Sequence, residues 1–187
     1  MRVVAGANRG RSLVSPRGSS TRPTSDRVRE ALFAIIGPVD GLDVLDLFAG
    51  SGALGIEALS RGAASATFVE RSAPALAAIR ANAAMVDDPA RVRIVGADWR
   101  AALRSERAAG RVYGLCLIDP PYSLLPRIVG RLGPALQPVL VAGATLVVEH
   151  ATEGGPVELP DLPVTARTDR TYGGTGIAIM RIGERVS

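Results

Sequence analysis

The sequence has one cysteine, Cys116, and one histidine, His150, among 187 residues. A single cysteine excludes an intrachain disulfide and a zinc cluster, and it fits a reducing, cytoplasmic setting. A lone histidine makes no metal site, so we expect no bound metal. The longest mostly apolar stretch, residues 139–148, is much shorter than the roughly 20 residues that cross a bilayer. Residues 1–6 contain no long apolar run, so we also expect neither a membrane segment nor a secretory signal.

Lysine is absent too, and all 22 basic residues are arginines. Hydrophobic residues make up 47% of the chain and charged residues 21%, which excludes global disorder and suits one domain with a full core. We expect a monomer.

The positive charge is concentrated at the start of the chain. Residues 1–29 carry seven arginines and one acid, whereas the remaining residues carry more acids than arginines. A basic arm is typical of proteins that bind a polyanion. We expect an arm over 1–24 and one domain over 25–187, with Arg9, Arg11, Arg22 and Arg27 as candidate ligands of a polyanion such as RNA. The alternative is a solvated, frayed terminus.

The arm contains two short strand-like pieces, residues 2–5 and 11–14, joined by a turn at 6–10, which predicts a β-hairpin. A helix is predicted over 26–36, capped by one of residues 24–26 and stopped at Gly37-Pro38. From residue 43 on, strands and helices alternate, which favours an α/β fold with a doubly wound parallel sheet. Strands are expected at 44–48, 66–69, 92–95, 114–118 and 144–149, helices at 53–61, 73–85, 99–107 and 124–136, and a final antiparallel hairpin at 164–171 and 177–182.

A glycine-rich turn follows the first expected strand. Gly50, Gly52 and Gly55 match the G-x-G-x-x-G spacing that lets the backbone approach a ligand. Asp46, Glu70 and Asp98 each lie at the end of an expected strand, where open α/β sheets bind ligands. A carboxylate at position 46 does not suit the pyrophosphate of a dinucleotide, but it does suit a cationic sulfonium.

The acids therefore favour S-adenosylmethionine, with Asp46 at the methionine end, Glu70 at the ribose hydroxyls and Asp98 at the adenine amine. Taken singly, each acid could instead be a helix cap or a solvated strand end. Trp99 could flank the adenine or pack in the core. The full set of cofactor candidates is Asp46, Phe48, Gly50, Gly52, Glu70, Arg71, Asp98 and Trp99.

The segment Asp119-Pro120-Pro121-Tyr122 follows the apolar strand at 114–118. Two prolines fix φ and hold the backbone extended. The Asp119 carboxylate and the Pro120 carbonyl can accept N–H bonds of a base amine and stabilise the charge that develops on its nitrogen. The Tyr122 ring can stack on a flipped base. These four residues are our catalytic candidates; a plain proline-rich turn is the alternative.

These motifs resemble the class I methyltransferases that modify base amines. The stretches RVVAGANRGR at 2–11 and TRPTSDRVREALF at 21–33 narrow the resemblance to the RsmD-like methyltransferases. The resemblance covers essentially the whole chain. It implies a Rossmann-like fold, S-adenosylmethionine as cofactor and the small ribosomal subunit as partner. It also implies methylation of N2 of a guanine in 16S rRNA, guanine 966.

Other interpretations remain open at this stage. The tetrapeptide also permits a DNA adenine-N6 or cytosine-N4 methyltransferase, or an enzyme acting on another RNA base amine. However, the chain has no segment long enough to read a DNA sequence. A nucleotide-binding module without enzymatic activity would leave Asp119–Tyr122 without a purpose. Cys116 is expected in the core, and Tyr172 at a hairpin tip.

Overall fold

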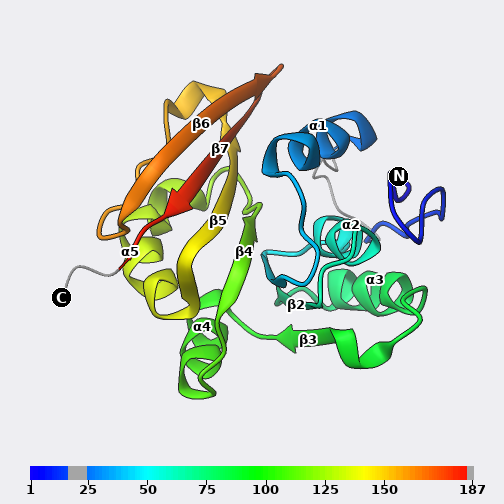
Figure 1. The fold of residues 1–187 in the computed structure, drawn as a ribbon. Helices are drawn as coiled ribbons and strands as arrows, with labels where there is room; N and C mark the ends of the chain where they lie inside the picture. The colour runs from blue at the N-terminus through cyan, green and yellow to red at the C-terminus, as the bar shows by residue number, and fades with distance from the viewer. Residues whose placement is uncertain (17–24, 185–187) are drawn as a thin grey trace.

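The computed structural model describes residues 1–16 and 25–184. Within these residues, five α-helices and seven strands follow one another in the order expected for an α/β fold, with three short 3-10 helices between them (Figure 1). The helices are α1 (Asp26–Ile36), α2 (Ala53–Ser60), α3 (Ala73–Ala83), α4 (Trp99–Ala108) and α5 (Leu125–Leu136). The strands are β1 (Asp43–Leu47), β2 (Ser65–Glu70), β3 (Val92–Gly96), β4 (Tyr113–Ile118), β5 (Leu140–Ala151), β6 (Val164–Tyr172) and β7 (Thr175–Ile182).

The strands form one sheet in the order β3-β2-β1-β4-β5-β7-β6. Strands β1 to β5 are parallel, whereas β7 pairs antiparallel with both β5 and β6. The predicted doubly wound sheet with an antiparallel C-terminal hairpin is therefore confirmed. Because the chain moves outward from β1 in both directions, the carboxyl ends of β1 and β4 lie side by side at a topological switch point.

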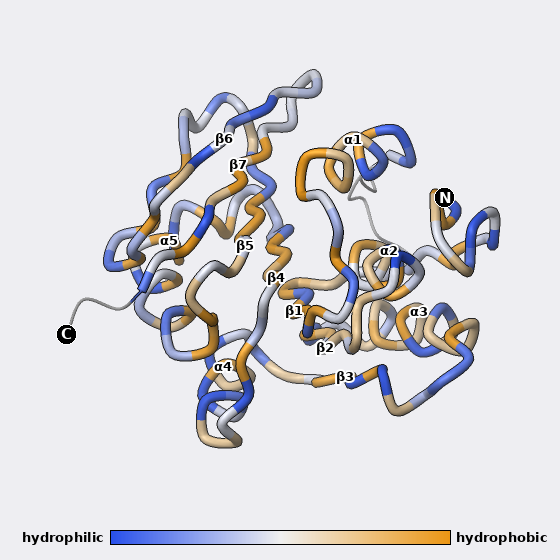
Figure 2. Tube along the Cα trace, viewed as in Figure 1, coloured by the Kyte–Doolittle hydropathy of each residue, from blue (hydrophilic) through white to orange (hydrophobic). Residues whose placement is uncertain are grey.

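Helices cover both faces of the sheet, and alternate strand residues belong to separate cores. On one face, Leu45 and Cys116 pack with α4 and α5; on the other, Val44 and Leu115 pack with α1, α2 and α3. Figure 2 shows the hydrophobic stretches along α2 and the central strands. Burial on both faces explains why these strands are apolar throughout. Cys116 is fully buried, as expected, and burial raises the pKa of its thiol.

The described part of the arm, residues 1–16, is attached to the body. Its two halves pair antiparallel at Arg2 and Ser12, but no regular strand forms. The reason is that the N–H groups of Val4 and Ala5 donate to Glu57 of α2 instead, at 2.8 and 3.0 Å. Val3 is buried at 1% exposure. A frayed terminus is therefore wrong for this segment, whereas the domain division at residue 24 stays a prediction.

Several element boundaries differ from those expected. Strand β5 extends beyond the expected 144–149 at both ends. It begins at Leu140 because Gly143 adopts φ 79° and a register shift opposite β4 lets the chain keep pairing, and it continues to Ala151 because its end pairs with β7. The C-terminal hairpin closes through Gly173-Gly174 alone, so Tyr172 lies inside β6. Ser25 caps α1, as the sequence predicts. Among the described residues, no helix is long and apolar enough to span a membrane.

Candidate functional site

A cavity of about 1050 Å³ opens at the carboxyl ends of the parallel strands, and we call it the cavity below. It is lined by the ends of β1, β2, β4 and β5, by the loops that follow them and by the arm. The lining includes Asp46, Phe48, Gly50, Glu70, Arg71, Asp98, Trp99, Asp119, Pro120, Pro121 and Tyr122. All four predicted catalytic residues therefore line the cavity. So do the predicted cofactor residues, except Gly52.

The turn after β1 brings the backbone to the cavity. Gly52, the N-cap of α2, has φ 77°, a left-handed conformation that favours glycine. Gly55 is required by space, since a Cβ atom there would lie 2.4 Å from the Phe68 ring. Phe48 also has a positive φ, 66°, which is uncommon without glycine and occurs at functional sites.

Asp46 lies under this turn and is fully buried. Its Oδ2 accepts the N–H of Gly55 at 2.9 Å. Burial raises the pKa of the Asp46 carboxyl to about 7; the Gly55 N–H lowers it, and the charge of Glu70 raises it further. A cation placed beside Asp46 would favour the ionised carboxylate. Binding of a cation beside Asp46 would therefore lower the pKa of its carboxyl.

Glu70, at the end of β2, fixes the same turn. Its Oε2 accepts the N–H of Gly50 at 3.0 Å, and its Oε1 accepts those of Arg71 and Ser72 at 2.7 and 2.9 Å. Oε1 thus accepts two N–H groups, whereas Oε2 accepts one and keeps a further lone pair. Glu70 can therefore hold the glycine turn and also accept a ligand hydroxyl.

Asp98 and Trp99 have structural roles in addition to lining the cavity. Asp98 caps α4, and its Oδ1 accepts the N–H of Arg100 at 3.0 Å, as the helix-cap alternative requires. Trp99 is 4% exposed and packs in the core, and the Arg100 guanidinium lies over its ring at 4.8 Å. Contact of either residue with a cofactor stays a prediction.

The Asp119–Tyr122 segment leaves β4 toward the cavity. Its first residue is tied to β1, because Asp119 N–H donates to Leu47 O at 3.4 Å. The carbonyl of Pro121 accepts the N–H of Leu124 at 2.8 Å, which starts the turn into α5. Tyr122 is 44% exposed, so its ring is accessible to a ligand.

The Tyr122 side chain is held by hydrogen bonds at its hydroxyl end. It is 2.9 Å from Thr175 Oγ1 and donates to Glu149 Oε1 at 3.5 Å. Partial burial is the main cause that raises the pKa of Tyr122, and the charges of Glu149 and Asp119 add to it. The ring is thus oriented by strands β5 and β7.

The predicted RNA-binding arginines differ in their surroundings. Arg9 and Arg27 are exposed, whereas Arg11, also exposed, donates from Nη1 to Met85 O at 2.8 Å. Arg22 lies outside the described residues. The arginines that line the cavity are others: Arg71, Arg100 and Arg127.

Sequence reasoning missed two groups of cavity residues. Glu149 is the last residue of the strand expected at 144–149, so the strand-end position that singled out the other acids applied to it too. In the structure it lies inside β5, whose buried run ends at His150. The arm also lines the cavity, through Met1, Ser15 and Pro16. No local sequence pattern predicts this contact. The single histidine, His150, is buried, and its Nδ1 lies 3.0 Å from Ala151 O.

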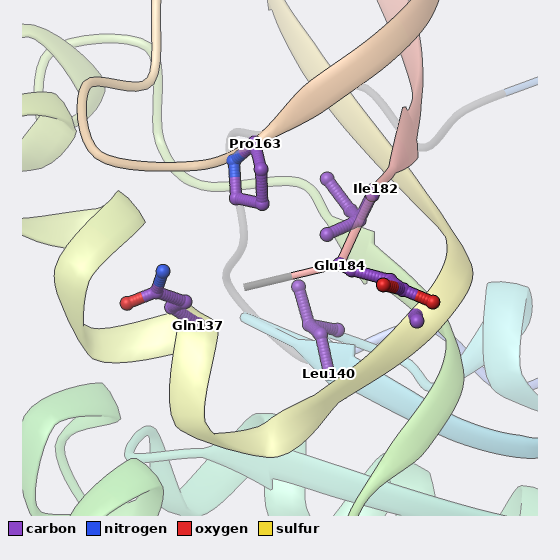
Figure 3. Close-up of a pocket in the computed structure, with 7 residues that line it drawn as sticks. Gln137, Leu140, Pro163, Ile182 and Glu184 are labelled. Atoms are coloured by element: carbon purple, nitrogen blue, oxygen red, sulfur yellow. The ribbon is translucent and has the colours of Figure 1, made fainter. Parts of the chain in front are cut away.

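A second pocket, of about 380 Å³, lies at the opposite end of the sheet, where β5 begins and β7 ends. Figure 3 shows its lining, with Leu140, Pro163 and Ile182 beside Gln137 and Glu184. It contains none of the predicted site residues. Within 1–16 and 25–184, no group of three or more potential metal ligands is gathered in one place.

The sheet order, the glycine turn and the cavity define a class I methyltransferase fold, as expected. The family described as Conserved hypothetical protein 95 matches residues 1–181. The chain belongs to this family, that of the RsmD-like methyltransferases, and the resemblance drawn from its motifs is confirmed.

Three similar proteins represent the family. YlbH of Bacillus subtilis, named provisionally as an rRNA methyltransferase, is 40% identical over 190 residues, covering 97% of this chain and 98% of its own. Ribosomal RNA small subunit methyltransferase D of Escherichia coli K12 is 36% identical over 166 residues, covering 87% and 79%. The solved structure of Escherichia coli yhhF, named provisionally as a methyltransferase, has TM-score 0.82 and 31% identity and covers 98% of both chains.

Proposed function

We propose that this protein transfers the methyl group of S-adenosylmethionine to the exocyclic N2 of a guanine in 16S rRNA, guanine 966. The observation that carries the proposal is that one cavity holds both the Asp46–Glu70 turn and the Asp119–Tyr122 segment. A methyl donor and a flat base amine can meet there without further rearrangement of the sheet. The relative named ribosomal RNA small subunit methyltransferase D supports this substrate.

The cavity suits S-adenosylmethionine in size and chemistry. Its volume, about 1050 Å³, is at the upper end of the range of small-molecule sites, roughly 300–1,000 Å³. The buried Asp46 carboxyl suits the cationic methionine end, and Glu70 suits the ribose diol. When bound, S-adenosylmethionine supplies an electrophilic methyl group on a sulfonium.

The residues after β4 would activate the amine. The N2 lone pair of guanine is delocalised into the ring, so the amine is a weak nucleophile. Asp119 and the Pro120 carbonyl accept its N–H bonds, which favours a pyramidal nitrogen and stabilises the positive charge that forms during transfer. Tyr122, whose hydroxyl is anchored, stacks on the base and fixes its distance from the donor. Asp119 then accepts the proton that the methylated nitrogen releases.

The arm and the first turn of α1 would supply contact with the phosphate backbone. Arg9 in the arm and Arg27 in α1 are exposed, and all of the net positive charge lies in residues 1–29. Because the described arm also lines the cavity through Met1, Ser15 and Pro16, RNA bound to it would lie beside the reacting base. With an rRNA partner the protein would act in the cytoplasm, and a monomer stays our prediction.

The test is transfer of radiolabelled methyl groups to rRNA, to assembled small subunits lacking the modification and to DNA, followed by nucleoside analysis. We expect N2-methylguanosine from an rRNA substrate. Asp119→Asn should reduce the rate by at least 100-fold with cofactor affinity within a few-fold, and Asp87→Asn, an equal change at an exposed residue outside the cavity, should do neither. N6-methyladenine, N4-methylcytosine or an unaffected Asp119→Asn rate would contradict the proposal.

A further inference from the structure

Glu149 is a buried carboxylate at the base end of the cavity. Val148 pairs with Ile118, so Glu149 and Asp119 follow paired residues of neighbouring strands at the same edge of the sheet. Glu149 is 8% exposed and lines the cavity. It therefore lies beside the segment that would receive the base, well away from the β2 end where Glu70 holds the glycine turn.

Contacts with Tyr122 define the side of the cavity that Glu149 faces. The Tyr122 hydroxyl donates to Glu149 Oε1 at 3.5 Å, and the same hydroxyl is 2.9 Å from Thr175 Oγ1. A base stacked on the Tyr122 ring would have one edge near this hydroxyl and near Glu149. A carboxylate there accepts hydrogen bonds and repels lone pairs.

We propose that Glu149 selects guanine by accepting the N1–H of the target base while Asp119 and Pro120 accept the N–H bonds of N2. This inference rests on the proposed function. Guanine presents N1–H next to its N2 amine, so two neighbouring acceptors fit this edge. Adenine at N1 and cytosine at N3 present a lone pair next to their amine, which a buried carboxylate rejects. Glu149 is thus a specificity-determining residue and takes no part in the transfer of the proton from N2.

The experiment uses synthetic RNA of the methylated segment with either guanine or 2-aminopurine at the target position. 2-Aminopurine keeps the N2 amine but carries a lone pair at N1. The unmodified protein should methylate the guanine RNA roughly 10- to 100-fold faster, the effect of leaving a buried acceptor opposite a lone pair. In Glu149→Gln, the side-chain amide can donate to N1 of 2-aminopurine, and the preference should fall to within a few-fold.

Two further variants keep the test decisive. Glu149→Asp retains the carboxylate and should retain the preference for guanine at a lower rate. Glu153→Gln makes the same charge change at an exposed residue that does not line the cavity, and it should change nothing. Because 2-aminopurine differs from guanine in the reactivity of its amine, the comparison is the ratio of rates in each variant against the ratio in the unmodified protein.

The outcomes separate the two proposals. An unchanged preference in Glu149→Gln overturns the role of Glu149, and so does an equal loss on both RNAs together with weaker cofactor binding, since that is a structural effect. If the unmodified protein methylates guanine in no RNA, the proposed function itself fails. A preference that collapses in Glu149→Gln but survives in Glu149→Asp supports the inference.

Discussion

Replacing Asp46 by asparagine tests the electrostatics of the cofactor site. The carboxyl is fully buried, and its pKa is raised from 3.8 to about 7, chiefly by burial. Asparagine has nearly the same shape, and its Oδ1 can still accept the Gly55 N–H. The substitution therefore removes the titration of this group while keeping its hydrogen bond.

The sign and size of the effect follow from the two pKa values. Because the folded pKa exceeds the unfolded one, the folded state holds its proton more tightly between pH 4 and pH 7, and the free energy of unfolding falls as pH rises through this window. The difference between 3.8 and about 7 corresponds to about 4 kcal/mol. Above pH 7 the unmodified protein carries the full cost of the buried charge.

Urea unfolding of both proteins between pH 4 and pH 8 measures this difference. The stability of Asp46→Asn relative to the unmodified protein should increase by about 4 kcal/mol from the acid to the alkaline end. Groups common to both proteins cancel in the comparison, and Asp87→Asn, an exposed position, should show no such trend. A difference that is constant with pH would refute the argument from burial.

The same carboxyl should govern cofactor binding. A cationic ligand prefers the ionised form, so the affinity of the unmodified protein for S-adenosylmethionine should rise from pH 6 to pH 8 as Asp46 loses its proton. In Asp46→Asn the affinity should be weaker and independent of pH over this range. Calorimetry at three pH values measures the affinity of both proteins for S-adenosylmethionine. If the affinity changes with pH in the same way in both, the cation lies elsewhere in the cavity.

Four other changes probe the site and the arm. Glu70→Ala leaves the N–H of Gly50 without its acceptor and should weaken cofactor binding by about 1–3 kcal/mol in calorimetry; unchanged affinity would remove Glu70 from the site. Tyr122→Ala should slow transfer by about 1–3 kcal/mol if the ring stacks on the base, and Tyr122→Phe, which keeps the ring, should slow it less; equal rates in both variants would exclude stacking. Arg9→Ala should reduce the slope of log RNA affinity against log salt by about 0.7–0.9 with cofactor binding unaffected, and an identical slope would exclude a phosphate contact. Glu57→Ala removes the acceptor of the Val4 and Ala5 N–H groups together with the buried ion-pair partner of Arg61 and Arg29, so it should lower the unfolding free energy by about 3–5 kcal/mol in urea titration; a loss well below this range would mean that the polar contacts of Glu57 contribute little.

The comparison of sequence with structure is clearest at the strand ends. Asp46 and Glu70 were identified from local order alone, a strand followed by a glycine turn or a helix, and both line the cavity. Asp98 follows the same rule, but its side chain caps α4, a role that the sequence left open. Glu149 also ends an expected strand, 144–149, but β5 continues to Ala151, so neither a glycine turn nor a helix follows Glu149 directly.

The arm shows where local reasoning ends. Its basic charge and turn could be predicted, but its attachment could not, because Glu57 and Ser60 lie more than 50 residues further along the chain. A glutamate at position 57 gives α2 the same sequence pattern whether its side chain faces solvent or is buried under the arm. Only the folded structure shows that Arg11 donates a hydrogen bond from Nη1 to Met85 O.

The sequence by itself determined the alternation of strands and helices, the glycine turn after β1 and the Asp119–Tyr122 segment. These features depend on the backbone preferences and the polarity of neighbouring residues. The tertiary structure alone decided that β5 and β7 bring Glu149 and Thr175 to the Tyr122 hydroxyl, and that the arm closes one side of the cavity. Such contacts join residues that are distant in the chain, and they form only when the sheet order places their strands side by side.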